Sequence, residues 1–252
     1  MGVFSRSKCF LAVLLVTVLS ACFAGCYSKI KGWSEESFRQ ESFTESVLNH
    51  EGLALLPVIV LMRPVEKSPE KGGEIVSAPY APGKSAEKPE EKQGNVASAY
   101  RIILNETLLS QFQSKLPEIR LITPGDALIR LNDAGMAAAY SKFDTEFTQT
   151  GLDANTLQSF GKALNSRFLF ISIAVVSEYK TDASMTLVWT IGRKSEFRSV
   201  KISGQIWDTK TCQHLWEGSG VGYNRLAPFE GSPLLEEMSS QAVKSLLEAI
   251  FR

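Results

Sequence analysis

Residues 200–220, VKISGQIWDTKTCQHLWEGSG, carry the pattern that decides the fold. In the first half, small or apolar residues alternate with polar positions as far as Trp207, which is typical of a β-strand with one buried face. Asp208 then opens a polar stretch, and an aspartate there typically shapes a turn by accepting backbone hydrogen bonds. A second strand follows and carries Trp216, which we expect to pack inward. The stretch therefore predicts an antiparallel hairpin.

The hairpin continues a run of strands. Residues 168–179, FLFISIAVVSEY, and residues 184–191, SMTLVWTI, have the apolar and β-branched content of two further strands. Together with the hairpin they predict a four-stranded antiparallel meander. A helix then closes the chain, because Ser232 and Pro233 form a start signal and apolar residues recur at helical spacing up to Ile250.

The earlier half of the chain adds a buried strand and several helices. Residues 53–62, LALLPVIVLM, form a continuous apolar run, and Pro57 within it must lie at a bulge, at an edge or near the strand's end because it has no N–H. Start signals and apolar spacing predict a short strand at 119–122 and helices at 98–116, 124–133, 137–148 and 153–164. The predicted fold class is α/β, with a mixed, mainly antiparallel sheet covered by helices, in a single domain over 51–252.

Residues 64–97 interrupt that domain. They hold half of the chain's ten prolines together with many lysines and glutamates, and they contain almost no large apolar residue. Such a composition buries too little surface to offset the entropy of ordering. We expect a disordered or extended insertion, which is either a spacer or a functional arm.

The amino terminus carries a secretion signal. Arg6 and Lys8 precede an apolar run at 9–19 that is too short to span a bilayer comfortably. It ends in LSAC, residues 19–22, which resembles a bacterial lipobox at all four positions. That resemblance implies removal of residues 1–21 and lipidation of Cys22. FAGC, ending at Cys26, is a weaker alternative because phenylalanine replaces the usual leucine.

Lipid on Cys22 implies a membrane-anchored protein outside the cytoplasm. Two acyl chains on the thioether and one on the new amino group give a stable anchor, whereas a single chain binds only marginally. Residues 22–50 then serve as a polar tether. Because Phe23 follows the cysteine in place of aspartate, bacterial sorting rules favour the outer membrane, with the domain facing the periplasm.

Composition and cysteines restrict the partners. The formal net charge is zero, with no basic face of the kind that nucleic acid requires. The candidate metal ligands of the mature chain, Cys26, Cys212, His50 and His214, show no ligand-pair spacing, so no metal is expected. A disulfide between Cys26 and Cys212 and two free thiols both remain open.

No catalytic motif is recognisable. A G-x-S-x-G elbow is absent, and GSGVGY at 218–223 follows a strand without opening a helix, so it predicts a bulge or an exit turn in place of a phosphate cradle. We therefore expect no enzyme, no catalytic residues, no cofactor and no small-molecule substrate.

Three segments resemble the curli-secretion lipoprotein family and its relatives among penicillin-binding-protein activator lipoproteins and the amino-terminal domain of TolB. They are LALLPV at 53–58, FGKALNSRFLFISIAV at 160–175 and the stretch at 200–220, and the resemblance covers most of residues 50–252. Two features depart from that group. The turn after Asp208 lacks the usual glycine, and four strands between 168 and 223 leave no hairpin for a transmembrane pore.

The resemblance and the lipobox together imply a non-enzymatic adaptor or assembly factor that binds another envelope protein. The alternative is a homo-oligomeric subunit of a secretion assembly. Trp207 is the candidate partner-binding residue, because it falls on the polar phase of its strand and tryptophan supplies a large contact area.

Overall fold

The computed structural model of this protein describes residues 30–67, 91–181, 195–225 and 235–252. Within these ranges the strands are β1 (Lys31–Arg39), β2 (Leu53–Leu55), β3 (Ile59–Lys67), β4 (Leu121–Ile122), β5 (Phe168–Thr181), β6 (Ser195–Asp208) and β7 (Gln213–Arg225). The helices are α2 (Glu45–Glu51), α3 (Glu91–Lys115), α4 (Pro124–Asp133), α5 (Ala137–Thr150), α6 (Ala154–Leu164) and α7 (Leu235–Ile250).

All described strands form one mixed sheet. Their order is β1-β7-β6-β5-β2-β4, and β3 continues the line of β2 along β5. The pairs from β1 to β5 are antiparallel, whereas β2, β3 and β4 join in parallel. The structure confirms the predicted α/β class and its mainly antiparallel sheet.

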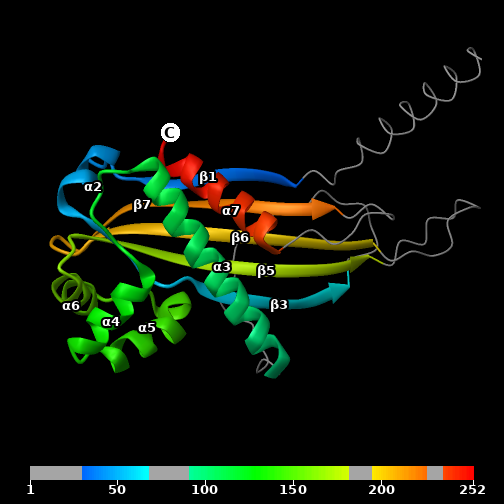
Figure 1. The fold of residues 1–252 in the computed structure, drawn as a ribbon, viewed down its shortest axis with the longest axis horizontal. Coiled ribbons are helices and arrows are strands. Elements are labelled where there is room, and N and C mark those ends of the chain that lie inside the picture. The colour runs from blue at the N-terminus through cyan, green and yellow to red at the C-terminus, as the bar shows by residue number, and fades with distance from the viewer. Residues whose placement is uncertain (1–29, 68–90, 182–194, 226–234) are drawn as a thin grey trace, which may run out of the picture.

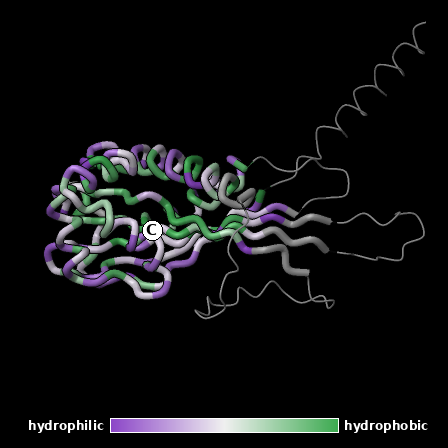
Figure 2. The backbone as a smooth tube through the Cα atoms, turned by 90° about the horizontal axis from the view of Figure 1, so that it is seen from below, coloured by the Kyte–Doolittle hydropathy of each residue, from purple (hydrophilic) through white to green (hydrophobic). Residues whose placement is uncertain are grey.

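Helices cover both faces of the sheet, but unequally. Helices α3 and α7 lie across one face, while α4, α5 and α6 gather at one end of the molecule (Figure 1). Strand β5 is buried from both sides, because Phe168 and Phe170 pack in the cluster under α3 and α7, and Leu169 and Ile171 pack in the cluster with α4 to α6. Figure 2 shows the strands running on beyond the helices at the other end.

The amino-terminal segment is not all tether. Residues 31–39 form β1, whose backbone pairs with β7 from Lys31 opposite Tyr223 to Arg39 opposite Trp216. The expected tether over 22–50 is therefore wrong from residue 31 onward. β1 is an edge strand with mostly exposed side chains, so its sequence lacks the alternation that a half-buried strand shows.

The antiparallel part of the sheet differs from the predicted four-stranded meander, because it includes β1. β5 and β6 pair directly, from Phe168 opposite Asp208 to Thr181 opposite Ser195. The fourth antiparallel strand is β1, from the start of the domain. The strand expected at 184–191 lies outside the described residues.

The apolar run at 53–62 is interrupted at Pro57. Strands β2 and β3 flank the proline and both pair with β5. The Leu56 amide donates to the Phe170 carbonyl oxygen at 3.0 Å, and the Val58 amide donates to Asn105 Oδ1 of α3 at 2.9 Å. The expectation that Pro57 lies at a bulge, an edge or a strand end is confirmed.

Helix α3 begins earlier than its sequence pattern indicated. It starts at Glu91, ahead of Ser98, so the expected insertion at 64–97 is shortened at both ends by β3 and α3, and residues 68–90 lie outside the description. Its predicted apolar face is confirmed, because the following side chains are all buried: Tyr100, Leu104, Leu108, Phe112 and the adjoining Leu116.

The predicted starts of α4 and α6 carry capping hydrogen bonds, whereas Ser98 lies inside α3 and is therefore not its cap, and Ser232 lies outside the described residues. The Thr123 hydroxyl accepts a hydrogen bond from the Asp126 amide at 3.1 Å at the start of α4, and Pro124 takes the first helical position. Asp153 caps α6 by accepting from the Thr156 amide at 2.9 Å. Each cap satisfies an N–H group that the helix itself leaves free.

The glycines of GSGVGY lie inside β7, and Gly220 and Gly222 face α7. A Cβ on Gly220 would overlap the Ala242 carbonyl oxygen and the Leu246 amide nitrogen, and a Cβ on Gly222 would overlap the Met238 carbonyl oxygen. The interpretation as a bulge or exit turn is wrong. These glycines let the helix backbone approach the strand closely.

No helix in the described ranges is long and apolar enough to cross a lipid bilayer.

Candidate functional site

The turn between β6 and β7 closes the end of the sheet where α2 and α6 lie (Figure 1). Asp208 Oδ1 accepts hydrogen bonds from the amides of Lys210 at 2.8 Å and Thr211 at 3.3 Å. Its predicted turn-forming role is confirmed. Cys212 has a φ of 56°, the left-handed conformation that glycine usually occupies, so the cysteine stands where the resemblance led us to expect glycine.

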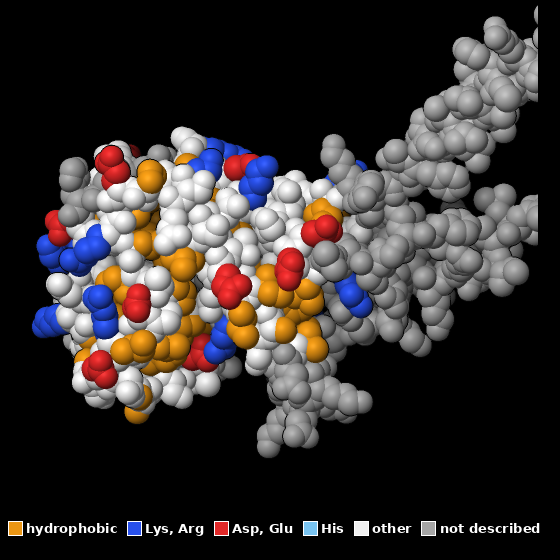
Figure 3. Space-filling model, viewed as in Figure 1, with side chains coloured by type: hydrophobic (Ala, Val, Ile, Leu, Met, Phe, Trp, Pro, Cys, Tyr) orange, Lys and Arg blue, Asp and Glu red, His pale blue; other side chains and the backbone are white. Residues whose placement is uncertain are grey.

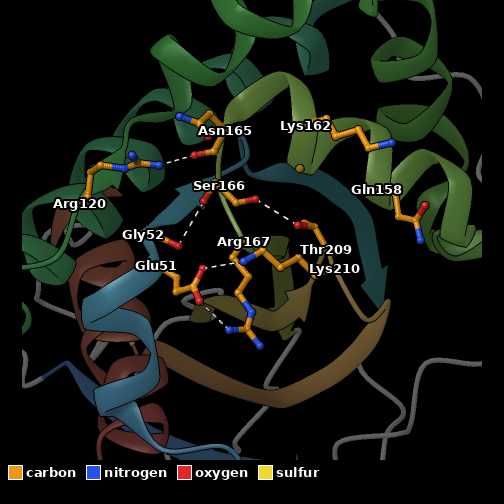
Figure 4. Close-up of a pocket in the computed structure, with 11 residues that line it drawn as sticks. Glu51, Gly52, Arg120, Gln158, Lys162, Asn165, Ser166, Arg167, Thr209 and Lys210 are labelled. Atoms are coloured by element: carbon orange, nitrogen blue, oxygen red, sulfur yellow. Dashed lines mark hydrogen bonds and ion pairs between the residues drawn. The ribbon is translucent and has the colours of Figure 1, made fainter.

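Arg167, between α6 and β5, connects this turn to α2. Its Nε and Nη2 atoms donate to Asp208 Oδ2 at 3.1 and 2.9 Å. Its Nη1 donates to Glu51 Oε1 at 2.9 Å (Figure 4). Lys210 Nζ donates to the other oxygen of Glu51 at 2.9 Å. Two carboxylates and two cations thus form a continuous chain.

Asp208 and Glu51 are both held ionised by this chain. Burial of Asp208 disfavours its charged form, but hydrogen bonds from Arg167 and from the amides of Lys210 and Thr211 outweigh that effect and lower its pKa. The hydrogen bond from Lys210, followed by that from Arg167, lowers the pKa of Glu51.

Glu51, Arg167 and Lys210 border an open cleft of about 620 Å³. Its floor is polar and satisfied, since Ser166 Oγ donates to the Gly52 carbonyl oxygen at 3.2 Å and Thr209 Oγ1 donates to the Ser166 carbonyl oxygen at 3.1 Å. Several lysines and arginines lie at this end of the molecule (Figure 3). Four cations and one carboxylate line the cleft: Arg120, Lys162, Arg167, Lys210 and Glu51.

Two of the four cations lack an acidic partner in the part of the chain that the structure describes. Arg120 and Lys162 lie on either side of Asn165, where α6 ends (Figure 4). Arg120 donates to the Asn165 carbonyl oxygen, and neither side chain forms an ion pair with any described residue. The cleft therefore has a surplus of positive charge.

Beside the turn, three rings form a row across β6, β7 and β1. His214 stacks on Trp207 at a centroid distance of 4.6 Å and on Phe38 at 5.0 Å. Burial lowers the pKa of His214, and Glu217, 3.7 Å away, opposes that shift. Phe38 is 42% exposed and Trp207 is half-buried, with its Nε1 donating to Gln205 Oε1 at 3.0 Å.

The other predicted residues separate into two groups. Trp216 is fully buried, as expected, whereas Cys22 and Cys26 lie outside the described residues. The disulfide between Cys26 and Cys212 and the two free thiols therefore both stay open.

The described residues contain no group of three or more histidines, cysteines, aspartates and glutamates that could hold a metal ion. The Cys212 thiol instead packs at the turn, where it accepts a hydrogen bond from Gln158 Nε2 at 3.3 Å.

Comparisons with known proteins assign no family. No family model matches the sequence, and no curated protein matches it. The carboxy-terminal domain of LpoB from Salmonella enterica is 10% identical, with a TM-score of 0.33, over 68% of this chain and 81% of that one. PelC from Paraburkholderia phytofirmans, solved as a dodecamer, is 10% identical, with a TM-score of 0.32, over 88% and 96%. A neuraminyllactose-binding hemagglutinin homologue from Helicobacter pylori is 10% identical, with a TM-score of 0.34, over 86% and 90%.

Proposed function

We propose that this protein is a lipid-anchored adaptor of the bacterial cell envelope. Lipid on Cys22 holds it at the outer membrane, facing the periplasm, and it acts by binding another envelope protein and not by catalysis. The lipobox LSAC at 19–22 is the observation that carries this proposal. The fold supports it, because β1 begins at Lys31 and leaves only residues 22–30, the leader, between the lipidated cysteine and the sheet.

The start of β1 supports one orientation of the anchored domain. From Cys22 to Lys31 the chain reaches at most about 32 Å, compared with about 100 Å for a tether that ended at residue 50. The aromatic row lies roughly 23 to 30 Å from Lys31 along β1 and β7, and the cleft lies beyond it at the β6–β7 turn. A short leader thus favours an orientation in which that end faces the periplasm.

Replacing Cys22 by alanine is expected to abolish lipidation, because the thioether forms on this sulfur. Metabolic labelling with radioactive palmitate measures it directly, and Cys26→Ala is the matched control. Label should enter the wild type and Cys26→Ala but not Cys22→Ala. Label that survives Cys22→Ala and disappears in Cys26→Ala would move the anchor to the second cysteine, and an unlabelled wild type would exclude a lipoprotein.

Trp207 is the residue through which we expect the aromatic row to contact the partner. Trp207→Phe keeps a ring on the core and should cost less than about 1.5 kcal/mol of stability. The measurement is crosslinking in intact cells followed by mass spectrometry of the captured envelope protein. Its recovery should fall several-fold with Trp207→Phe, since tryptophans often dominate binding. Trp33→Phe is the control, because Trp33 is 39% exposed but lies near the membrane-proximal start of β1. Equal recovery from both variants would remove Trp207 from the binding surface.

The alternative to the adaptor is a homo-oligomeric subunit of a secretion assembly. Detergent-extracted protein that elutes as one large assembly on a sizing column would support it, and a monomer would count against it.

A further inference from the structure

The cleft at the β6–β7 turn already holds one carboxylate. Glu51 accepts 2.9 Å hydrogen bonds on both oxygens, one from Arg167 and one from Lys210. One guanidinium nitrogen and one ammonium that meet on the same carboxylate form a charge-assisted arrangement. This part of the cleft is neutralised from within the chain.

Arg120 and Lys162 form the opposite rim of the cleft, and neither meets a carboxylate among the described residues. Arg120 donates a hydrogen bond to the carbonyl oxygen of Asn165, at the carboxy terminus of α6. A cation is favourable there because the helix end carries partial negative charge. Lys162 is exposed and has no hydrogen-bond or ion-pair partner among the described residues. One rim therefore presents two cations to solvent.

Counting the ionised side chains that line or support the cleft gives a net positive charge. The cations are Arg120, Lys162, Arg167 and Lys210, and the carboxylates are Glu51 and Asp208. The chain as a whole has a formal net charge of zero, so this excess is local. A local excess in a concave surface attracts and orients negatively charged groups.

We infer that the cleft binds a carboxylate-rich segment of the partner protein, with Arg120 and Lys162 as the contacting cations. This inference rests on the proposed adaptor function and adds the chemistry of the partner. Acidic side chains fit better than nucleic acid because these four cations line a single cleft, whereas a phosphate backbone needs an extended basic face. The cleft lies at the end of the sheet away from the start of β1, where a periplasmic partner can reach it.

Fluorescence anisotropy tests the inference with a fluorescein-labelled hexaglutamate peptide, on the mature lipidated protein in neutral detergent at low salt. Hexaglutamate should bind and hexaglutamine should not. Lys162→Gln should weaken binding roughly threefold to fivefold, the usual worth of one partly exposed charge pair. Lys162→Arg should restore it. Because Lys162 has no partner among the described residues, thermal unfolding of Lys162→Gln should match that of the wild type.

Lys142→Gln is the matched control. Lys142 is an exposed lysine of α5 that does not line the cleft, and Glu146 is its ion-pair partner at 3.9 Å. An equal loss with Lys142→Gln would show non-specific attraction and overturn the inference. Binding of inorganic phosphate without hexaglutamate would overturn it in favour of a phosphate site, and no binding of either would overturn it outright. The assay contains no envelope partner, so its failure leaves the adaptor proposal to be judged by palmitate labelling and crosslinking.

Discussion

Gly220→Ala is expected to lower the free energy of unfolding by about 3 kcal/mol, the upper range for overpacking a core. The new Cβ would overlap backbone atoms of Ala242 and Leu246, and backbone cannot rotate away as a side chain can. Helix α7 would have to move off β7 and give up contacts of its buried stripe. Urea or thermal unfolding measures the effect directly.

Gly125→Ala is the matched control for that substitution. A Cβ on Gly125 would meet only Thr123 Oγ1, at 3.9 Å, and the residue lies in the first turn of α4. Its stability should be unchanged or raised by up to about 1 kcal/mol, because alanine favours a helix. Similar losses from both alanines would contradict the close packing of α7 on the glycines of β7.

Asp208→Ala is expected to cost about 3 kcal/mol, the lower range for removing one partner of a buried ion pair. The Asp208 side chain is only 3% exposed, and its loss leaves the amides of Lys210 and Thr211 without an acceptor and Arg167 with Glu51 alone. Asp133→Ala, at an exposed aspartate in α4, should change stability by less than about 0.5 kcal/mol. Comparable losses would show that the ion-pair chain does not organise this end of the fold.

The same carboxylate predicts a pH dependence. The folded pKa of Asp208 lies below its ordinary value of 3.8, so between the two values the unfolded chain binds more protons than the folded one. Its stabilisation is complete above about pH 4 and is lost as pH falls through the folded pKa. The stability gap between wild type and Asp208→Ala should therefore narrow below about pH 4. A gap that stays constant to pH 2 would contradict the depressed pKa.

Short-range features of the fold were predictable from the sequence. Helix caps such as Thr123 and Asp153 act over three residues, and the stripe on α3 repeats every turn, so both can be recognised locally. β1 was missed because an exposed edge strand is held by backbone pairing with β7, which polar side chains do not reveal. The glycines of β7 were misinterpreted because their reason is the approach of α7, which follows only from the packed structure.

The cleft was only partly predictable. Asp208 was recognised as a turn residue, but Arg167 meets Glu51 across 116 positions of sequence, and the lining comes from α2, β4, α6 and the β6–β7 turn. Single lysines and arginines in such segments are typical of any surface. Their convergence depends on the strand order, which places β2 between β4 and β5.

Site-specific photocrosslinking in intact cells tests the central claim most directly, that this is a tethered module whose partner docks at the end away from its lipid. A photoreactive residue at position 162 places the probe on the cleft rim, and one at position 142 places it on α5. We predict an adduct with one envelope protein from position 162 and none from position 142. Equal adducts from both positions, adducts only between copies of this chain, or no adduct at all would contradict the account.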